Sequence, residues 1–281
     1  MYLAVKEFGN DLSRKIALEK EQNLKWKEVE LFLKQLEIKG LHVESRYDSM
    51  GLKIENFPDS ILSEYRITMH KNGLNTLYND DEYEIWDKEF ESIFNTIKKY
   101  NKIEDLSFHP PVTTKNHPFF LDNLSNDERV NSQRLLKKLI LKWIPIFKEI
   151  HVTLSLESHI SEKFFIFYGP DEYIDFINSI DDLYALLDVA HNHYDRYSNE
   201  YLIKKLKGKI SGLHISDAIQ GENFREDIHR EVGKGDIDFS FIENLEINDK
   251  TFFAFEIKKN KEEIINSVSA IKKQFNHIFN T

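Results

Sequence analysis

Short apolar runs typical of β-strands alternate with longer stretches of helical periodicity, and this alternation constrains the fold more than any other feature of the sequence. Eight runs predict strands, at residues 2–5, 40–44, 65–69, 106–108, 152–156, 184–187, 210–215 and 252–257. Apolar residues three and four apart predict helices between them, at residues 13–36, 57–62, 86–100, 127–150, 171–180, 199–206 and 262–279. Alternating strands and helices form a parallel sheet with helices outside it, and eight units predict a closed (β/α)8 TIM barrel. An open doubly wound sheet is the main rival, but no glycine-rich phosphate loop follows the first strand.

The whole chain is expected to form one domain. Its 281 residues suit a single barrel, 41% of them are hydrophobic, and no linker or shift in composition divides residues 1–281. The net charge of −10 disfavours unspecific nucleic-acid binding, although a cleft that holds metal ions can be positive within an acidic protein. The early charged residues and the lack of an apolar run near ~20 residues predict a cytoplasmic protein without a membrane span.

The ends of the predicted strands carry the chemically informative residues. Six successive strands deliver a histidine, aspartate or glutamate there: His70, His109, Glu157, Asp188 with His191, His214, and Glu256. In a barrel these ends meet on one face, and ionisable side chains set in apolar strands are costly unless they are paired or bind a metal. The chain has no cysteine, so the ligands must be His, Asp and Glu, which suit Zn²⁺, Mn²⁺ or Fe²⁺. The sequence therefore predicts a divalent-metal centre in which Glu157 can bridge two ions.

The segment after the seventh predicted strand adds two candidate ligands. Asp227 and His229 are two residues apart, so in an extended segment their side chains point the same way. Gly233 and Gly235 allow a tight backbone path after them. Asp217 is expected either to orient a metal-bound imidazole or to cap a turn. Three flanking cations could clamp a phosphate or be solvated: Arg225, Arg230 and Lys234.

These motifs resemble the xylose isomerase-like barrels of AP endonuclease family 2, which include endonuclease IV. The resemblance covers most of the chain, from about His70 to Glu256. It is carried by Ser-Phe-His109-Pro, by Leu-Asp188-Val-Ala-His191, and by His214-Ile-Ser-Asp followed by Asp227-Ile-His229-Arg-Glu-Val-Gly-Lys-Gly.

The endonuclease IV pattern uses nine ligands for three zinc ions, and each ligand has a matching position in this chain. The resemblance implies hydrolysis of a phosphodiester by a metal-bridged hydroxide, with two or three Zn²⁺ ions, or Mn²⁺ in their place. The partner would be a phosphoester, either abasic DNA or a small nucleotide or sugar phosphate. The three implied ligand groups are His70, His109 and Glu157; Glu157 again with Asp188, His214 and Glu256; and His191, Asp227 and His229.

Sugar isomerases and epimerases with the same barrel are the alternative. They use one ion, and two glutamates, here Glu157 and Glu256, act as acid and base next to a carbonyl carbon. The additional histidines at the strand ends favour the phosphoesterase, whereas Gly73 stands where endonuclease IV has an aromatic residue that enters the DNA stack. A catalytically silent barrel is disfavoured because every ligand type is retained. Outside these groups, His42 is expected to be structural and His159 to have a supporting or solvent-facing role, and the oligomeric state stays open.

Overall fold

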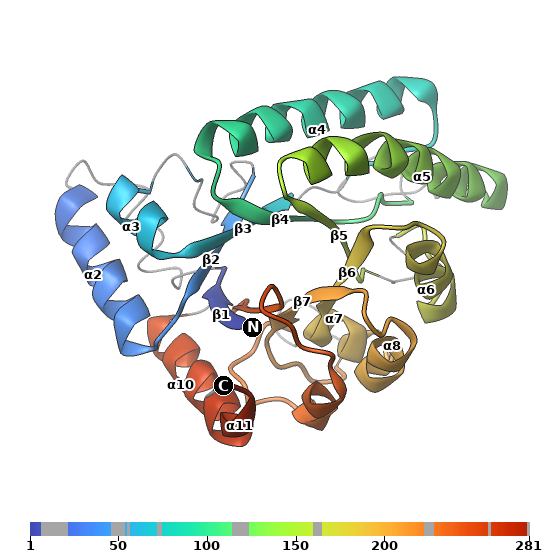
Figure 1. Ribbon diagram of the computed structural model, residues 1–281. Coiled ribbons are helices and arrows are strands. Elements are labelled where there is room, and N and C mark those ends of the chain that lie inside the picture. Colours follow the sequence, from blue (N-terminus) through green and yellow to red (C-terminus); the bar gives the residue numbers. More distant parts are fainter. Residues whose placement is uncertain are drawn as a thin grey trace.

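Eight parallel strands form a closed barrel in the computed structural model of this protein. Each strand pairs with the next one along the chain, and β8 pairs with β1, so the sheet has no free edge. The helices form a ring outside the strands (Figure 1). The prediction of a (β/α)8 barrel is therefore confirmed. The structure describes residues 1–6, 22–45, 54, 57–71, 75–113, 124–159, 165–221, 228–257 and 260–279.

The eight predicted strands all form, with shifted ends. The largest difference is at the fourth strand, which begins at Ile103 rather than at residue 106. The strands are β1 Tyr2–Val5, β2 Gly40–Glu44, β3 Arg66–Lys71, β4 Ile103–Phe108, β5 Thr153–Glu157, β6 Leu183–Asp188, β7 Ile210–Ile215 and β8 Phe252–Phe255.

The helices follow the predicted order, with two additions. The short helix α7 and the 3₁₀ helix η2 are not indicated by apolar periodicity, because both are only six residues long. The last predicted helix is divided in two at Phe275. The elements are α2 Gln22–Gln35, α3 Asp59–Glu64, α4 Asp80–Tyr100, α5 Asn126–Glu149, α6 Pro170–Asn178, α7 Val189–Tyr194, α8 Asn199–Lys205, η2 Phe239–Asn244, α10 Lys261–Gln274 and α11 Asn276–Phe279.

Capping residues explain where the two long helices begin. Helix α4 starts at Asp80 rather than at residue 86, because the Asn79 side chain accepts a hydrogen bond from the Glu82 N–H. Helix α5 starts with a reciprocal pair in which Ser125 and Glu128 each bond to the other's backbone N–H. The two helices lie side by side against the barrel (Figure 1). Among the described residues, no helix has the length and apolar character needed to cross a membrane.

The barrel interior changes in character along its axis. An apolar cluster at the N-terminal side of the strands contains Tyr2, Ala4, Leu186, Phe252 and Ala254. Beside it, Asp105 in β4, Ser155 in β5 and Ser211 in β7 form a chain of hydrogen bonds. The predicted metal ligands lie further along, at the C-terminal ends of the strands. Apolar packing thus forms the floor beneath the polar cluster.

Candidate metal centre

Six of the predicted ligands lie on one face of the barrel, where the strands end. All six side chains are buried, although each is ionisable. They occupy equivalent places in the sheet: His70 in β3, His109 after β4, Glu157 at the end of β5, Asp188 at the end of β6, His214 in β7 and Glu256 after β8.

Glu157 joins two groups of candidate ligands because its two oxygens face different neighbours. Oε2 lies 3.2 Å from His70 Nε2 and 3.0 Å from His109 Nε2. Oε1 lies 3.1 Å from His214 Nδ1 and 3.2 Å from His159 Nε2. The ligand atoms of His70, His109 and Glu157 all lie within 4.8 Å of one another, so one cation could contact all three.

His214 Nδ1 is the central atom of the second group. Glu157 Oε1 and Glu256 Oε2 each lie 3.1 Å from this nitrogen, and Asp188 Oδ2 lies 3.6 Å from it. The ligand atoms of these four residues also lie within 4.8 Å of one another. Three carboxylates and one imidazole, all buried, form a donor set suited to a divalent cation.

The Asp-x-x-His spacing has a local structural cause. Asp188 is the N-cap of α7, and its Oδ1 accepts a hydrogen bond of 2.8 Å from the His191 N–H. This bond holds His191 one turn away from Asp188, and the two residues form a third group with His229. His229 has a left-handed backbone, with φ of 56°, which is strained for a residue other than glycine. Asp227, the predicted partner of His229, lies outside the described residues.

Asp217 organises the loop that carries His229 rather than orienting an imidazole. Its Oδ2 accepts hydrogen bonds from the N–H groups of Gly233 and Gly235, at 2.8 and 2.9 Å. Its Oδ1 accepts from Ala218 and Ile237, at 2.9 and 3.2 Å. A Cβ at position 235 would lie 2.2 Å from Asp217 Oδ1, so only glycine lets the backbone approach this carboxylate. Of the two predicted roles, the structure therefore supports the turn-forming one.

Burial keeps most of the imidazoles neutral, which is the form that binds metal. It lowers the pKa of His109 to about 4. It also lowers the pKa values of His70 and His191 well below the usual range, with a further contribution from Lys6 at His70. These nitrogens are therefore available as ligands at neutral pH.

The residues of the second group, by contrast, are held in their charged forms. Burial opposes ionisation of Glu157, Asp188 and Glu256, but nearby imidazoles, and Lys6 at Glu256, hold each carboxyl pKa well below its usual value. Burial also opposes protonation of His214, yet the carboxylates outweigh it and raise the pKa of His214 well above its usual value. His214 thus carries a proton between carboxylates in the metal-free protein, and a cation bound to its Nδ1 must displace that proton.

Two observations show that these residues fit a divalent cation. His70 Nε2 and Glu157 Oε2 are buried 3.2 Å apart, yet neither makes a hydrogen bond of good geometry among the described residues, although His109 Nε2 also lies 3.0 Å from Glu157 Oε2. Buried polar atoms without partners are costly, and a shared cation would satisfy both. In addition, three buried carboxylates around His214 carry more negative charge than that imidazole and Lys6 can balance. The chain therefore has His, Glu and Asp groups that could bind a metal.

Three residues of this face were not predicted as part of it. Lys6, directly after β1, contacts Glu256 Oε1 at 3.1 Å and Glu44 Oε1, at the end of β2, at 3.6 Å. His42, predicted to be structural, contacts His214 through nitrogen atoms 3.0 Å apart. The period-two alternation of β1 and β2 is the signal that could have found them, because it directs the side chains of Lys6, His42 and Glu44 inward.

His159 has a larger part than predicted. It is buried against Glu157, and its ring centroid lies 4.3 Å from the centroids of both His109 and His191. It therefore separates the first ligand group from the third. Of the predicted phosphate-clamp cations, Arg230 donates to the Lys234 carbonyl and Lys234 is exposed, whereas Arg225 lies outside the described residues.

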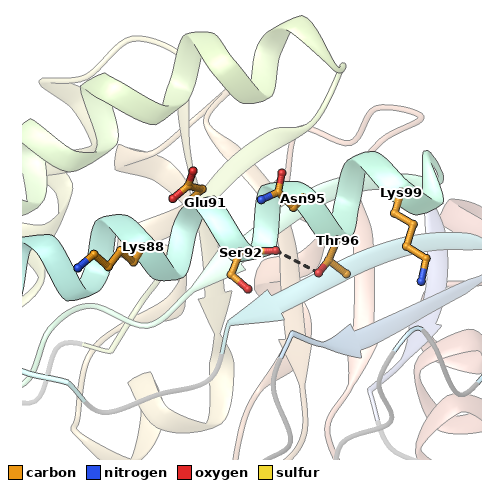
Figure 2. A pocket seen from close by; sticks show the side chains of 6 residues that line it. All are labelled: Lys88, Glu91, Ser92, Asn95, Thr96 and Lys99. Atoms are coloured by element: carbon orange, nitrogen blue, oxygen red, sulfur yellow. Dashed lines mark hydrogen bonds between the residues drawn. The ribbon is translucent and has the colours of Figure 1, made fainter.

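A surface groove on α4 is unrelated to this centre (Figure 2). Its lining consists of Lys88, Glu91, Ser92, Asn95, Thr96 and Lys99, all on one helix. Five of these side chains are exposed, Thr96 is half-buried, and all six lie along one helix rather than converging on a point. The groove therefore offers no set of groups comparable with the strand ends.

Comparison with known proteins places the barrel in a family. The family described as xylose isomerase-like TIM barrel matches residues 67–274, a range that contains all nine predicted ligands. The chain belongs to this family. A sequence search of the curated proteins gave no match.

Several solved structures have a similar fold and match nearly the whole chain. A D-tagatose 3-epimerase-like protein has 16% identity and a TM-score of 0.70, covering 100% of this chain and 98% of its own. An L-ribulose 3-epimerase has 14% identity and a TM-score of 0.68, covering 98% and 95%. A 3-keto-D-glucoside 4-epimerase from E. coli has 13% identity and a TM-score of 0.65, covering 98% and 99%. At these identities the likeness establishes a shared xylose isomerase-like fold, and the chemistry has to be argued from the site.

Proposed function

We propose that this protein is a divalent-metal-dependent isomerase or epimerase that acts next to the carbonyl group of a sugar. The observation that carries the proposal is the pair of glutamates on one imidazole nitrogen. Glu157 Oε1, from β5, and Glu256 Oε2, from the end of β8, approach His214 Nδ1 to the same distance, 3.1 Å. The epimerases among the structural neighbours support the same choice. Hydrolysis, which the sequence placed first, becomes the second candidate.

The two glutamates supply the proton transfers. A divalent ion in the second group, Zn²⁺ or Mn²⁺, would polarise the sugar carbonyl and make the neighbouring C–H acidic. One glutamate carboxylate takes the proton from that carbon, and the electron pair of the C–H bond moves toward the carbonyl. The other glutamate, which must enter this step protonated, gives its proton to the opposite face of the carbon, which inverts the configuration there. The two glutamates exchange protonation states in this step, and exchange with water restores them.

Hydrolysis of a phosphoester is favoured by a different observation. An isomerase with one ion needs only the group around His214, yet His70 and His109 form another group on the second oxygen of Glu157. The group of Asp188, His191 and His229 adds a third. Two or three ions in these groups would suit attack of water on phosphorus. The substrate would then be a sugar phosphate, a small nucleotide or abasic DNA, and cytoplasmic residence stays a prediction from the sequence.

Solvent-deuterium incorporation separates the two reactions. The protein, loaded with Mn²⁺ or Zn²⁺, is incubated in D₂O with D-fructose, D-tagatose, D-allulose or L-ribulose, and proton NMR follows the carbons next to the carbonyl. The isomerase is expected to introduce deuterium there even without net conversion, because the abstracted proton exchanges with solvent. The same preparation is assayed on bis(p-nitrophenyl) phosphate and on an oligonucleotide with an abasic site.

The variants sharpen this test. Glu157→Gln and Glu256→Gln should each abolish deuterium incorporation, whereas His109→Ala, outside the group around His214, should retain most of it. Phosphoester hydrolysis that is lost in His109→Ala, with no exchange on any ketose, would reject the isomerase in favour of the hydrolase. Metal content per chain, measured by mass spectrometry, gives one equivalent for the first mechanism and two or three for the second.

A further inference from the structure

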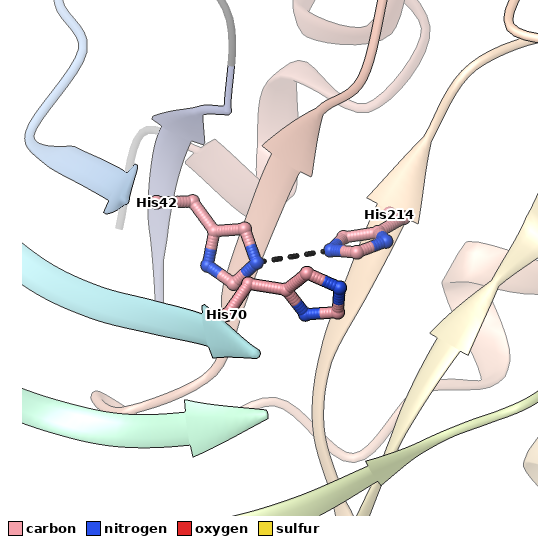
Figure 3. Close-up of side chains that lie close together, drawn as sticks. All are labelled: His42, His70 and His214. Atoms are coloured by element: carbon pink, nitrogen blue, oxygen red, sulfur yellow. Dashed lines mark hydrogen bonds between the residues drawn. The ribbon is translucent and has the colours of Figure 1, made fainter. Parts of the chain in front are cut away.

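His42 lies deep in the barrel against two of the candidate ligands. Its side chain is buried in β2, and its ring centroid lies 5.0 Å from that of His214 and 5.4 Å from that of His70 (Figure 3). His42 Nε2 lies 3.0 Å from His214 Nε2, and His42 Nδ1 lies 2.6 Å from Thr68 Oγ1. Both ring nitrogens of His42 are therefore engaged, and Phe252 packs against the ring at 5.4 Å.

The contact between His42 and His214 restricts where each ring carries its proton. A hydrogen bond between two imidazole nitrogens needs one N–H and one bare nitrogen. His214 Nδ1 faces the carboxylates, and a cation can bind this atom only when it has lost its proton. The neutral His214 ring then carries its proton on Nε2, so the N–H must donate to His42 Nε2. The proton of His42 consequently lies on Nδ1, where it donates to Thr68 Oγ1.

We propose that His42 is a positioning residue for the metal centre, because it accepts the Nε2–H of His214 and so holds His214 Nδ1 ready to bind a cation. A metal-bound histidine usually donates its second N–H to a carboxylate, a carbonyl or a water molecule. Here another histidine takes that place, and Thr68 fixes its orientation in turn. The inference rests on the metal centre of the proposed function, and it holds for either reaction.

A role for His42 as a direct metal ligand has less support than this positioning role. One nitrogen each of His42, His70 and His214 lie within 4.8 Å of one another, so the three could in principle surround a cation. That arrangement would use the nitrogen of His214 that faces away from its three carboxylates. The carboxylate-rich side of His214 is the better place for a divalent charge.

Nitrogen NMR reads the proton positions directly. Full-length protein labelled with ¹⁵N-histidine is freed of metal, reloaded with Zn²⁺, and examined through its two-bond ¹H–¹⁵N correlations, with His42 and His214 assigned from single variants. We expect His214 to show a zinc-bound Nδ1 and a protonated Nε2, and His42 a bare Nε2 and a protonated Nδ1. A proton on His42 Nε2, or zinc bound to His42, would overturn the proposal.

A matched pair of variants tests the consequence for binding. His42→Gln keeps an acceptor near the position of Nε2, whereas His42→Leu removes it. Zinc affinity is measured by competition with a chromophoric chelator, and urea unfolding of the metal-free forms checks that both variants fold. His42→Leu should bind zinc about 10- to 100-fold more weakly, and His42→Gln should recover most of this loss. Equal affinities in the two variants would refute the role of His42 and leave the metal centre standing, whereas a wild type that takes up no zinc would refute both.

Discussion

The stability of an Asp105→Asn variant, measured relative to wild type, should increase as the pH rises. Asp105 points into the barrel from β4, and its Oδ2 accepts a hydrogen bond of 2.6 Å from Ser155 Oγ. Its Oδ1 has no hydrogen-bond partner among the described residues. Burial raises the pKa of Asp105 from 3.8 to about 7, even though the hydrogen bonds of Ser155 and Ser211 act in the opposite direction.

The size of the effect follows from this shift. A carboxyl whose pKa is raised on folding holds a proton in the folded state that the unfolded chain has lost. The contribution of Asp105 to the free energy of unfolding is complete below pH 3.8, and it is lost as the pH rises to about 7. Over the whole window the shift of about three units corresponds to about 4 kcal/mol, and between pH 5 and 8 the remaining two units correspond to about 3 kcal/mol.

Urea unfolding of the metal-free protein at several pH values measures this difference. Asparagine stays neutral and resembles the protonated carboxyl, so the stability of Asp105→Asn relative to wild type should rise by about 3 kcal/mol from pH 5 to pH 8. Any cost of burying the amide N–H is independent of pH and does not alter the rise. Asp249→Asn, at an exposed position, should show no such change. A difference between Asp105→Asn and wild type that stays flat across this range would refute the reasoning.

Three further predictions concern the loop and the metal. Asp217→Ala removes the acceptor of four backbone N–H groups and should destabilise the fold by about 3 kcal/mol or more, measured by urea unfolding. Gly235→Ala should lower the thermal midpoint more than Gly233→Ala does, because a Cβ at position 235 would lie 2.3 Å from the Ala218 carbonyl oxygen. A Cβ at position 233 would meet open space, so that variant bears only the strain of a φ of 88°. Equal effects of the two substitutions would contradict this account. Dialysis against a chelator should lower the thermal midpoint, and Zn²⁺ or Mn²⁺ should restore it, because the buried carboxylates regain a counter-charge. A thermal midpoint that neither treatment changes would count against the metal centre.

The barrel and the proximity of the main candidate ligands could be predicted from the sequence for the same physical reason. Parallel strands in a closed barrel must end on one face, so His70, Glu157, Asp188 and His214 could be placed together without knowledge of their distances. The local role of Asp188 was beyond prediction, because its capping bond to His191 depends on the backbone angles where β6 ends and α7 begins.

Contacts across the barrel explain what the sequence could not supply. His42 reads as an ordinary core histidine in an apolar strand, and only the closure of the sheet brings it from β2 to the ring of His214 on β7. Lys6 reads as the first charged residue after a strand, yet closure places it against Glu256. Strand alternation could show that these side chains point into the barrel, but it does not show which residue, far away in the chain, each of them contacts.

The divided contacts of Glu157 make the two proposed chemistries mutually exclusive at any instant. A carboxylate that bridges two cations has both oxygens committed and offers no lone pair basic enough to collect a proton. With the group of His70 and His109 empty, the same carboxylate keeps one oxygen for that task. The supply of metal would then select the reaction, since the occupancy of the site at His70 and His109 decides whether Glu157 acts as a base or as a bridging ligand.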